Sequence, residues 1–177
     1  MARTTDYIAV VGQIVEELEA LGLTPVLIGG MALVILGSRR VTRDYDFLVS
    51  NYADNPERLI KVFYKKGFEL ASKIDSEGNI VATLDNEKIA AVRLRLDAPS
   101  SAYFLNRQTG LRMDLLFDFP LPAAEIASRA QIKKVRSYGF RIASKEDLLK
   151  LKEIAYKDRS LSTDAQDLEF LKKHIKV

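Results

Sequence analysis

Cysteine is absent from the sequence and histidine occurs once, and both facts narrow the chemistry open to the chain. Without cysteine there is no disulfide framework, no thiolate zinc site and no cysteine nucleophile. The single His174 lies near the C-terminus, which disfavours a serine–histidine dyad or a histidine-based metal cage, and we assign it no role. Any bound metal is therefore expected to have oxygen ligands, which favours Mg²⁺ or Mn²⁺.

Long hydrophobic runs are absent as well. The longest apolar stretches, 26–28 and 31–36, are too short to span a bilayer, and the first residues show no apolar run behind a basic start. We therefore expect a cytoplasmic protein without a membrane partner. The net charge of +3 suits an anionic substrate but does not by itself indicate nucleic acid. The 177 residues, 47% of them hydrophobic, are enough for one domain with a buried core.

Hydrophobic periodicity predicts a protein that contains both helices and strands. Helices are predicted over residues 7–21, 31–36, 56–66, 144–158 and 163–173. Strands are predicted over residues 25–28, 45–49, 68–72, 80–84, 89–96 and 111–119, with a short hairpin over 132–142. The change from strands to helices near residue 143 predicts a core over 1–143 and a C-terminal helical segment over 144–177, packed on that core. Ser144 is the predicted N-cap of the first C-terminal helix.

Two glycines, Gly29 and Gly30, stand between a predicted strand and a predicted helix. Glycine permits such a tight turn for steric reasons alone, but it also lets phosphates approach the backbone N–H groups at the start of the helix. The turn is not a Rossmann fingerprint, because no third glycine follows at the required spacing. It is not a P-loop either, because no Gly-Lys-Ser/Thr follows.

Three aspartates lie on predicted strands. Asp44 and Asp46 are two residues apart, so their side chains share one face of a strand, and their mutual repulsion favours a cation between them. Asp114 interrupts an apolar strand and shares a face with Arg112 and Leu116. A carboxylate there is costly unless it is paired or metal-bound. Asp118 is a rival, but its place at the strand end predicts exposure.

In this order, the motifs resemble those of the polymerase-beta-like nucleotidyltransferase superfamily. That pattern is a hydrophobic residue, Gly, Gly or Ser, a variable stretch, Asp-x-Asp and a third carboxylate on a neighbouring strand, which here reads Ile28-Gly29-Gly30, Asp44-Tyr45-Asp46 and Asp114. Residues 29–47 are especially similar to the abortive-infection (AbiEii-like) toxin branch. The C-terminal part resembles the same branch through the order Lys152, Ala155, Arg159, Asp164 and Asp167-Leu168.

The resemblance implies the nucleotidyltransferase fold, which is an α+β fold with a mixed β-sheet flanked by helices. It also implies a two-metal transfer of a nucleoside monophosphate from an NTP to a hydroxyl. Asp44 and Asp46 would hold the metal on the triphosphate, and Asp114 would complete a second metal and activate the acceptor. Nucleotide-binding roles are implied for the glycine turn, the following loop and the C-terminal helices, at Gly29, Gly30, Met31, Ser38, Arg40, Thr42, Arg43, Lys152 and Asp167. Many relatives have serine at the position of Gly30, and this chain lacks that hydroxyl.

The acceptor stays open: the resemblance permits a tRNA end, a protein side chain or a small molecule such as an aminoglycoside, and a cognate antitoxin as partner. Two alternatives to an active enzyme also stay open. One is a relative of the same fold that binds nucleotide or a partner protein without chemistry. The other is a purely structural role, in which the loop arginines are a solvated basic surface, Lys152 is an ordinary surface lysine, and the carboxylates pair with Arg43, Arg93, Arg95 or Arg112.

Overall fold

The structure is a computed structural model that describes residues 7–50, 55–159 and 162–175. The sequence predicts no targeting segment at residues 1–6, and these residues lie outside the described part. The helices are α1 Tyr7–Ala20, α2 Gly29–Ile35, α3 Pro56–Tyr64, α4 Glu87–Asp97, α5 Ala123–Arg129, α6 Lys145–Arg159 and α7 Ser162–His174. The strands are β1 Val26–Ile28, β2 Tyr45–Val49, β3 Phe68–Ile74, β4 Ile80–Leu84, β5 Ser101–Asn106, β6 Arg112–Phe117, β7 Gln131–Val135 and β8 Tyr138–Ile142.

All the strands of the described part join one mixed sheet in the order β4-β3-β5-β6-β2-β1-β8-β7. At its centre β2 runs parallel to β6 and antiparallel to β1, and β1 runs parallel to β8. The register sets Ile28 opposite Asp46, and Asp46 opposite Asp114. The end of β1, the start of β2 and the middle of β6 therefore form one row across three adjacent strands.

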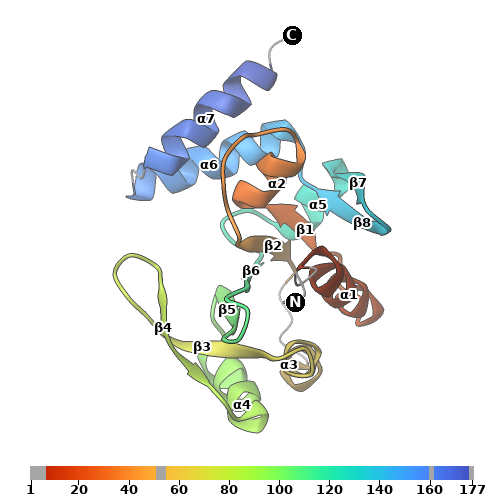
Figure 1. Cartoon of the computed structure of the whole chain (residues 1–177), viewed down its shortest axis with the longest axis vertical. Helices are drawn as coiled ribbons and strands as arrows, with labels where there is room; N and C mark the ends of the chain where they lie inside the picture. Colours follow the sequence, from red (N-terminus) through yellow and green to blue (C-terminus); the bar gives the residue numbers. More distant parts are fainter. Residues whose placement is uncertain (1–6, 51–54, 160–161, 176–177) are drawn as a thin grey trace, which may run out of the picture.

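The helices pack on the sheet and on one another (Figure 1). Helices α1, α3 and α4 pack in succession and contact β8, β3 and β4 respectively. Helix α2 packs on β1 and β2, α6 contacts α2, and α7 packs along α6. In Figure 1, α6 and α7 make up the blue end of the molecule, and α3 and α4 lie at the opposite end. Within the described part, every helix is too short or too polar to cross a membrane.

The core lies between these helices and the sheet, and aromatic side chains contribute strongly to it. Phe63 of α3 stacks on Phe104 of β5 with ring centroids 3.8 Å apart, and it meets the edge of Phe68 on β3 at 6.1 Å. All three rings are fully buried. Burying such large apolar surfaces is the main favourable term in folding, so this cluster fixes α3 to strands β3 and β5.

One predicted strand is wrong: residues 89–96 form part of helix α4. The residue before α4 is a helix cap, because the Asn86 side chain accepts a hydrogen bond of 3.0 Å from the backbone N–H of Ile89. The buried residues of the segment are Ala90, Ala91 and Leu94, which is helical spacing. Ile89, Val92 and Leu96 face outward, and these exposed apolar residues produced the false alternation.

Two elements were not predicted, strand β5 and helix α5. Strand β5 begins directly after Pro99-Ser100 and alternates buried Ala102 and Phe104 with partly exposed neighbours. Helix α5 is short, and its N-cap position is a proline without a capping side chain. Asp118 supplies a cap from a distance, since its carboxylate accepts a hydrogen bond of 2.9 Å from the N–H of Ala123.

Candidate functional site

The central strands place Asp46 and Asp114 side by side. Asp114 lies opposite Asp46 in the parallel β2–β6 pair, and both side chains face one cleft. The predicted alternation on β6 is confirmed: Met113 and Leu115 are fully buried on the other face, whereas Arg112 and Leu116 accompany Asp114 in the cleft. Asp118 is exposed, as predicted from its place after the strand end.

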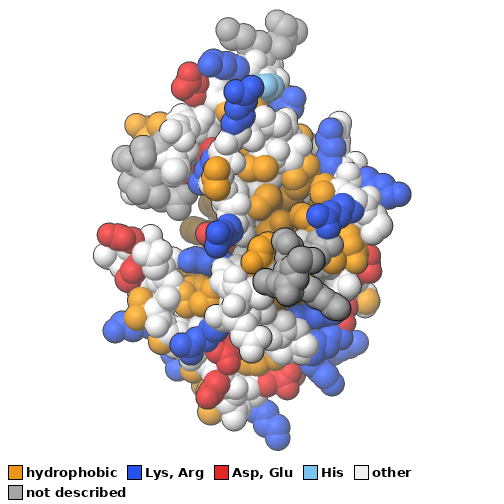
Figure 2. Space-filling model, in the orientation of Figure 1, with side chains coloured by type: hydrophobic (Ala, Val, Ile, Leu, Met, Phe, Trp, Pro, Cys, Tyr) orange, Lys and Arg blue, Asp and Glu red, His pale blue; other side chains and the backbone are white. Residues whose placement is uncertain are grey.

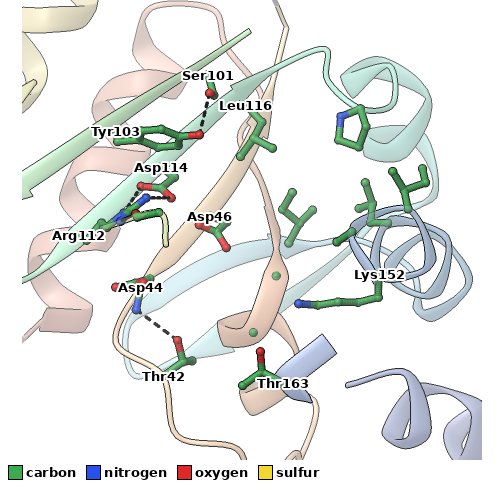
Figure 3. Close-up of a pocket in the computed structure, with 18 of the residues that line it drawn as sticks. Thr42, Asp44, Asp46, Ser101, Tyr103, Arg112, Asp114, Leu116, Lys152 and Thr163 are labelled. Carbon is green, nitrogen blue, oxygen red and sulfur yellow. Dashed lines mark hydrogen bonds and ion pairs between the residues drawn. The ribbon is translucent and has the colours of Figure 1, made fainter. Parts of the chain in front are cut away.

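The cleft has a volume of about 530 Å³ and lies between the sheet, the β3–β4 turn and helix α6. In Figure 2 the surface is hollowed at the left, between the α6–α7 end of the molecule and the β3–β4 hairpin. Figure 3 shows Asp44, Asp46 and Asp114 on one side and Lys152 reaching in from α6 on the other. The cleft is lined by the glycine turn, the loop before β2, the central strands and α6. The lining residues include Gly29, Gly30, Arg40, Thr42, Asp44, Asp46, Tyr103, Arg112, Asp114, Leu116, Leu148, Leu151 and Lys152.

Like charge is concentrated at the sheet side of the cleft. Burial, and then the negative charges of Asp114 and Asp44, raise the pKa of Asp46 to about 8. The neighbouring Asp114 carboxyl group adds to the shift, while the Lys152 ammonium acts in the opposite direction. Burial also raises the pKa of Asp114, against a lowering by Arg112. The raised pKa values of Asp46 and Asp114 mean that added positive charge, as a proton or as another cation, is favoured at this pair.

Arg112 is the cation that accompanies these carboxylates. Its guanidinium makes a bidentate ion pair with Asp114, at 2.8 and 3.1 Å, and donates a hydrogen bond of 2.6 Å to the carbonyl of Gly78 in the β3–β4 turn. It also lies over the Tyr103 ring, 4.9 Å from the centroid. We call Asp44, Asp46, Asp114 and Arg112 the carboxylate wall. Arg112 thus ties the β3–β4 turn to that wall.

The glycine turn leaves room for side chains from the loop and from β2. Gly29 has a positive φ of 73°, and a Cβ there would collide with the carboxylate of Asp46, 3.2 Å from its Cγ. A Cβ on Gly30 would overlap the guanidinium of Arg40, 2.8 Å from its Cζ. The backbone conformation of Gly29 therefore requires glycine, whereas a side chain on residue 30 would have to displace the end of the Arg40 side chain.

A second group of charges lies at the helical side of the cleft. The Asp167 carboxylate on α7 meets the Lys152 ammonium at 2.9 Å and the Arg40 guanidinium at 3.1 Å, and Asp164 meets Lys152 at 3.3 Å. Asp164, Asp167 and Lys152 are all buried. We call Arg40, Lys152, Asp164 and Asp167 the paired-charge cluster. Lys152 is thus not the ordinary surface lysine of the alternative interpretation.

The donor set suits an oxygen-loving cation. Among the described residues, no three acidic, histidine or cysteine side chains converge closely enough to form a complete metal cage. Asp114 is buried and Asp46 half-buried, however, and burial and neighbouring carboxylates raise the pKa of both, which favours added positive charge at this pair. Mg²⁺ is commonly held by one or two carboxylates, with substrate phosphates and water completing its shell. Asp46 and Asp114, with Asp44 beside them, fit that kind of site.

The predicted site residues divide into those that line the cleft and those that do not. Eight of them line it, namely Gly29, Gly30, Arg40, Thr42, Asp44, Asp46, Asp114 and Lys152. Ser38 lies behind the lining and accepts a hydrogen bond of 3.2 Å from the backbone N–H of Arg40. Asp167 is buried behind Arg40 and Lys152. Met31 and the exposed Arg43 are not part of the lining, and the side chain of Arg159 lies outside the described residues.

The arginines proposed as structural partners behave differently from one another. Arg93 pairs with Asp97 and Arg95 with Glu57, both on the exposed side of α4. Among the ion pairs of the described residues, only the one made by Arg112 engages a carboxylate that lines the cleft. An arginine therefore pairs with Asp114, as the structural alternative expected. Within the part of the chain that the structure describes, no ion pair involves Asp44 or Asp46.

The sequence did not identify Tyr103 as a residue of the cleft, and it did not predict that Asp164 is buried. Tyr103 belongs to strand β5, which was not predicted, so nothing placed it opposite Asp114. Asp164 and Lys152 had a signal in the helix pattern. Lys152 follows Leu148 and Leu151 on the apolar face of α6, and a charge on such a face requires a buried partner.

No protein-family model and no curated protein matches the sequence, but solved structures match the fold. The lincosamide antibiotic adenylyltransferase LnuA, bound to lincomycin, is 14% identical with a TM-score of 0.56, over 97% of this chain and 98% of that one. The antibiotic-resistance factor ANT(2'')-Ia is 11% identical with a TM-score of 0.61, over 96% and 84%. A nucleotidyltransferase-like antigenic protein from Paracoccidioides brasiliensis is 16% identical with a TM-score of 0.58, over 92% and 73%.

These structural relatives are nucleotidyltransferases or proteins like them. At such low identity the likeness establishes the fold alone. The chain has the nucleotidyltransferase fold: a mixed sheet with helices around it, as the sequence predicted.

Proposed function

We propose that the chain is a metal-dependent nucleotidyltransferase, which moves a nucleoside monophosphate from an NTP to a hydroxyl group. The observation that carries the proposal is the row across the central strands. Asp46 and Asp114 lie opposite each other and face one cleft with the Gly29-Gly30 turn. Paired carboxylates beside backbone N–H groups can hold a cation and a polyphosphate together. Nucleotidyltransferases among the structural relatives support the same reaction class.

Asp44, Asp46 and Asp114 would hold Mg²⁺ or Mn²⁺, which neutralises charge on the phosphates and on the attacking and leaving oxygens. Phosphate contacts are assigned to the backbone N–H groups of the glycine turn and to the cations near it. These residues are Gly29, Gly30, Met31, Ser38, Arg40, Thr42, Arg43, Lys152 and Asp167, with Ser38 and Asp167 acting through Arg40.

In the proposed reaction, the acceptor oxygen attacks the α-phosphorus. The bond from that phosphorus to the bridging oxygen of the β-phosphate breaks, and pyrophosphate leaves. The acceptor proton passes to the carboxylate of Asp114, which lines the cleft beside Leu116. Positioning and charge neutralisation supply most of the rate enhancement in such transfers.

Three acceptor classes follow from different observations. The resemblance of residues 29–47 and of the C-terminal residues to the AbiEii-like toxin branch favours a tRNA end or a protein side chain, with a cognate antitoxin as partner. The structural relatives LnuA, bound to lincomycin, and ANT(2'')-Ia, bound to adenylyl-2''-tobramycin, favour a small hydroxylated molecule. Supplying each class separately distinguishes them.

The test is transfer of label from each of the four α-labelled NTPs, with Mg²⁺, into a cell extract, purified tRNA, or a panel of aminoglycosides and lincosamides. We expect label in one acceptor class. Asp44→Asn and Asp46→Asn should each reduce the labelling by about a hundredfold or more. Asp118→Asn is the matched control, since Asp118 is an exposed carboxylate just beyond the end of β6. Undiminished labelling by both site variants would refute the metal assignment.

A second candidate function is nucleotide binding without transfer. The bidentate Arg112–Asp114 ion pair favours it, because a guanidinium already occupies the carboxylate that would activate the acceptor. Calorimetric titration with Mg²⁺ and a non-hydrolysable NTP separates the two candidates. Magnesium-dependent binding together with no transfer to any acceptor class favours the second. If the chain only binds nucleotide, Arg112→Gln should show no transfer activity, like the wild type. If the chain is an enzyme, the same change should alter its transfer rate.

A further inference from the structure

The paired-charge cluster has a layered arrangement. Arg40 and Lys152 line the cleft, whereas the carboxylates of Asp164 and Asp167 lie behind them and do not line it. Asp164 and Asp167 have exposed fractions of 0% and 1%. Two cations therefore form the front layer, and two buried carboxylates on α7 form the back layer. Buried carboxylates of this kind act on a bound anion only through the cations they hold.

Arg40 occupies a notch that exists because residue 30 is glycine. A Cβ at that position would overlap the Arg40 guanidinium and would lie 3.4 Å from Cγ2 of Thr42. The long side chain is thereby brought against the glycine turn, which lines the cleft. The guanidinium thus takes the space that a side chain on residue 30 would fill.

Asp167 holds Arg40 in that notch and leaves donors over. One guanidinium nitrogen, Nη1, meets Asp167, while the buried Nε has no hydrogen-bond partner among the described residues. Lys152 contacts the same carboxylate. Lysine and arginine lose considerable rotamer freedom when they bind an anion, so fixing them beforehand lowers the cost of binding.

We propose that Asp167, assisted by Asp164, is a positioning residue that makes α7 part of the triphosphate site, and that Arg40 in the Gly30 notch replaces a side chain of the glycine turn as phosphate donor. The inference rests on the proposed function. The two cations bind the terminal phosphates of the NTP, and they stand ready because the carboxylates behind them fix their positions. The monophosphate portion of the nucleotide has no part in this contact.

A double-mutant cycle tests the notch, with Mg²⁺ and α,β-methylene-ATP as the probe in calorimetry. Gly30→Ser should weaken binding about tenfold, because the new side chain displaces Arg40 and its charged hydrogen bonds. Arg40→Ala should weaken binding by a similar factor. In the Arg40→Ala background the notch is empty, so Gly30→Ser should have no further effect or should restore part of the affinity. If the two effects multiply instead, so that the double variant binds the probe about a hundredfold more weakly, the proposed role of the Gly30 notch is overturned.

Comparing ligands of different phosphate number tests Asp167. Asp167→Asn keeps the size of the side chain and removes its charge, and it should weaken the triphosphate analogue about tenfold while leaving AMP unchanged. The matched control is Asp147→Asn, a buried carboxylate on α6 that pairs with Arg129 away from the cleft. That variant should lower the melting temperature without changing the ratio of triphosphate to monophosphate affinity. Equal loss of both ligands in Asp167→Asn would show a merely structural role.

The same titrations separate this inference from the proposed function. Magnesium-dependent binding that is lost in Asp46→Asn but unchanged in Asp167→Asn and Arg40→Ala overturns the inference and leaves the proposed function intact. No binding of the magnesium–triphosphate analogue to the wild-type chain overturns both. Binding that falls selectively for the triphosphate in Asp167→Asn, with the Asp147→Asn ratio unchanged, supports the inference.

Discussion

The two sides of the cleft place charge in different ways. In the carboxylate wall, three aspartates face one arginine, which leaves a net charge of −2 when all are ionised. In the paired-charge cluster, two cations meet two carboxylates and the net charge is zero. The first side is incomplete without added positive charge, as the raised pKa of Asp46 shows. The second side is complete by itself.

The two sides also differ in what fixes them. Asp46 and Asp114 are placed by backbone register on adjacent strands, so little side-chain freedom remains. Arg40 and Lys152 are long side chains that come from a loop and a helix, and ion pairs to α7 help to determine where their charges lie. One side is therefore fixed by the sheet and carries excess negative charge, whereas the other is neutral and depends on tertiary contacts.

The largest expected effect comes from removing a cation from the complete side. Lys152→Met keeps the length of the side chain but removes the ammonium that the buried Asp164 and Asp167 share. Removing one partner of a buried ion pair typically costs about 3 kcal/mol or more, which lowers the melting temperature by roughly 10 °C. Thermal unfolding measures this directly. Lys150→Met, an exposed lysine on the same helix, should be nearly neutral, and equal melting temperatures for the two variants would refute the buried pairing.

Adding positive charge to the incomplete side should stabilise the chain. Mg²⁺ with a non-hydrolysable NTP, at a hundred times its Kd, should raise the free energy of unfolding by about 2.7 kcal/mol. Neither component alone should do so, because the carboxylates and the phosphates share the cation. Asp46→Asn should remove the magnesium-dependent part of the shift. A shift of the same size in that variant would mean that the ligand binds elsewhere.

Removing a carboxylate from the incomplete side should stabilise the metal-free chain at high pH. Because the pKa of Asp46 is raised to about 8 on folding, protonation favours the folded state. That stabilisation is fully present below the unfolded value near 4 and is lost as the pH rises through about 8. In EDTA, Asp46→Asn should therefore melt a few degrees above wild type at pH 9 and close to it at pH 4. A constant difference across this range would contradict the shift.

The same contrast explains which parts of the site the sequence predicted. Asp46 and Asp114 lie on strands whose alternation is visible in the sequence, and Asp44 directly precedes β2, so residue spacing alone is enough to deduce which face they share. The burial of Lys152 depends on Asp164 and Asp167 arriving from a separate helix, and composition alone marks Lys152 as an ordinary lysine. Pairing between distant elements is not encoded in local periodicity.

The fold shows the same limit at α4 and β5. The buried positions Ala90, Ala91 and Leu94 are small or few, whereas the exposed Ile89 and Val92 dominate the hydrophobic pattern. Local spacing therefore suggested a strand where Asn86 caps a helix. The central strands and the C-terminal helices were predicted correctly, because their apolar residues are the ones that the core buries.

The smallest expected effect separates helix formation from ion pairing as the cause of Lys152's position. The Ser144 hydroxyl caps α6 by accepting a hydrogen bond of 3.1 Å from the N–H of Asp147 and donating one of 2.9 Å to its carboxylate. Ser144→Ala should cost about 1 kcal/mol, as should Asn86→Ala at the start of α4, far from the cleft. Fraying is confined to the first turn and Lys152 is held by α7, so neither variant should change the affinity for the magnesium–triphosphate analogue. A several-fold loss in Ser144→Ala alone would show that the start of α6, and not the carboxylates behind it, places the ammonium.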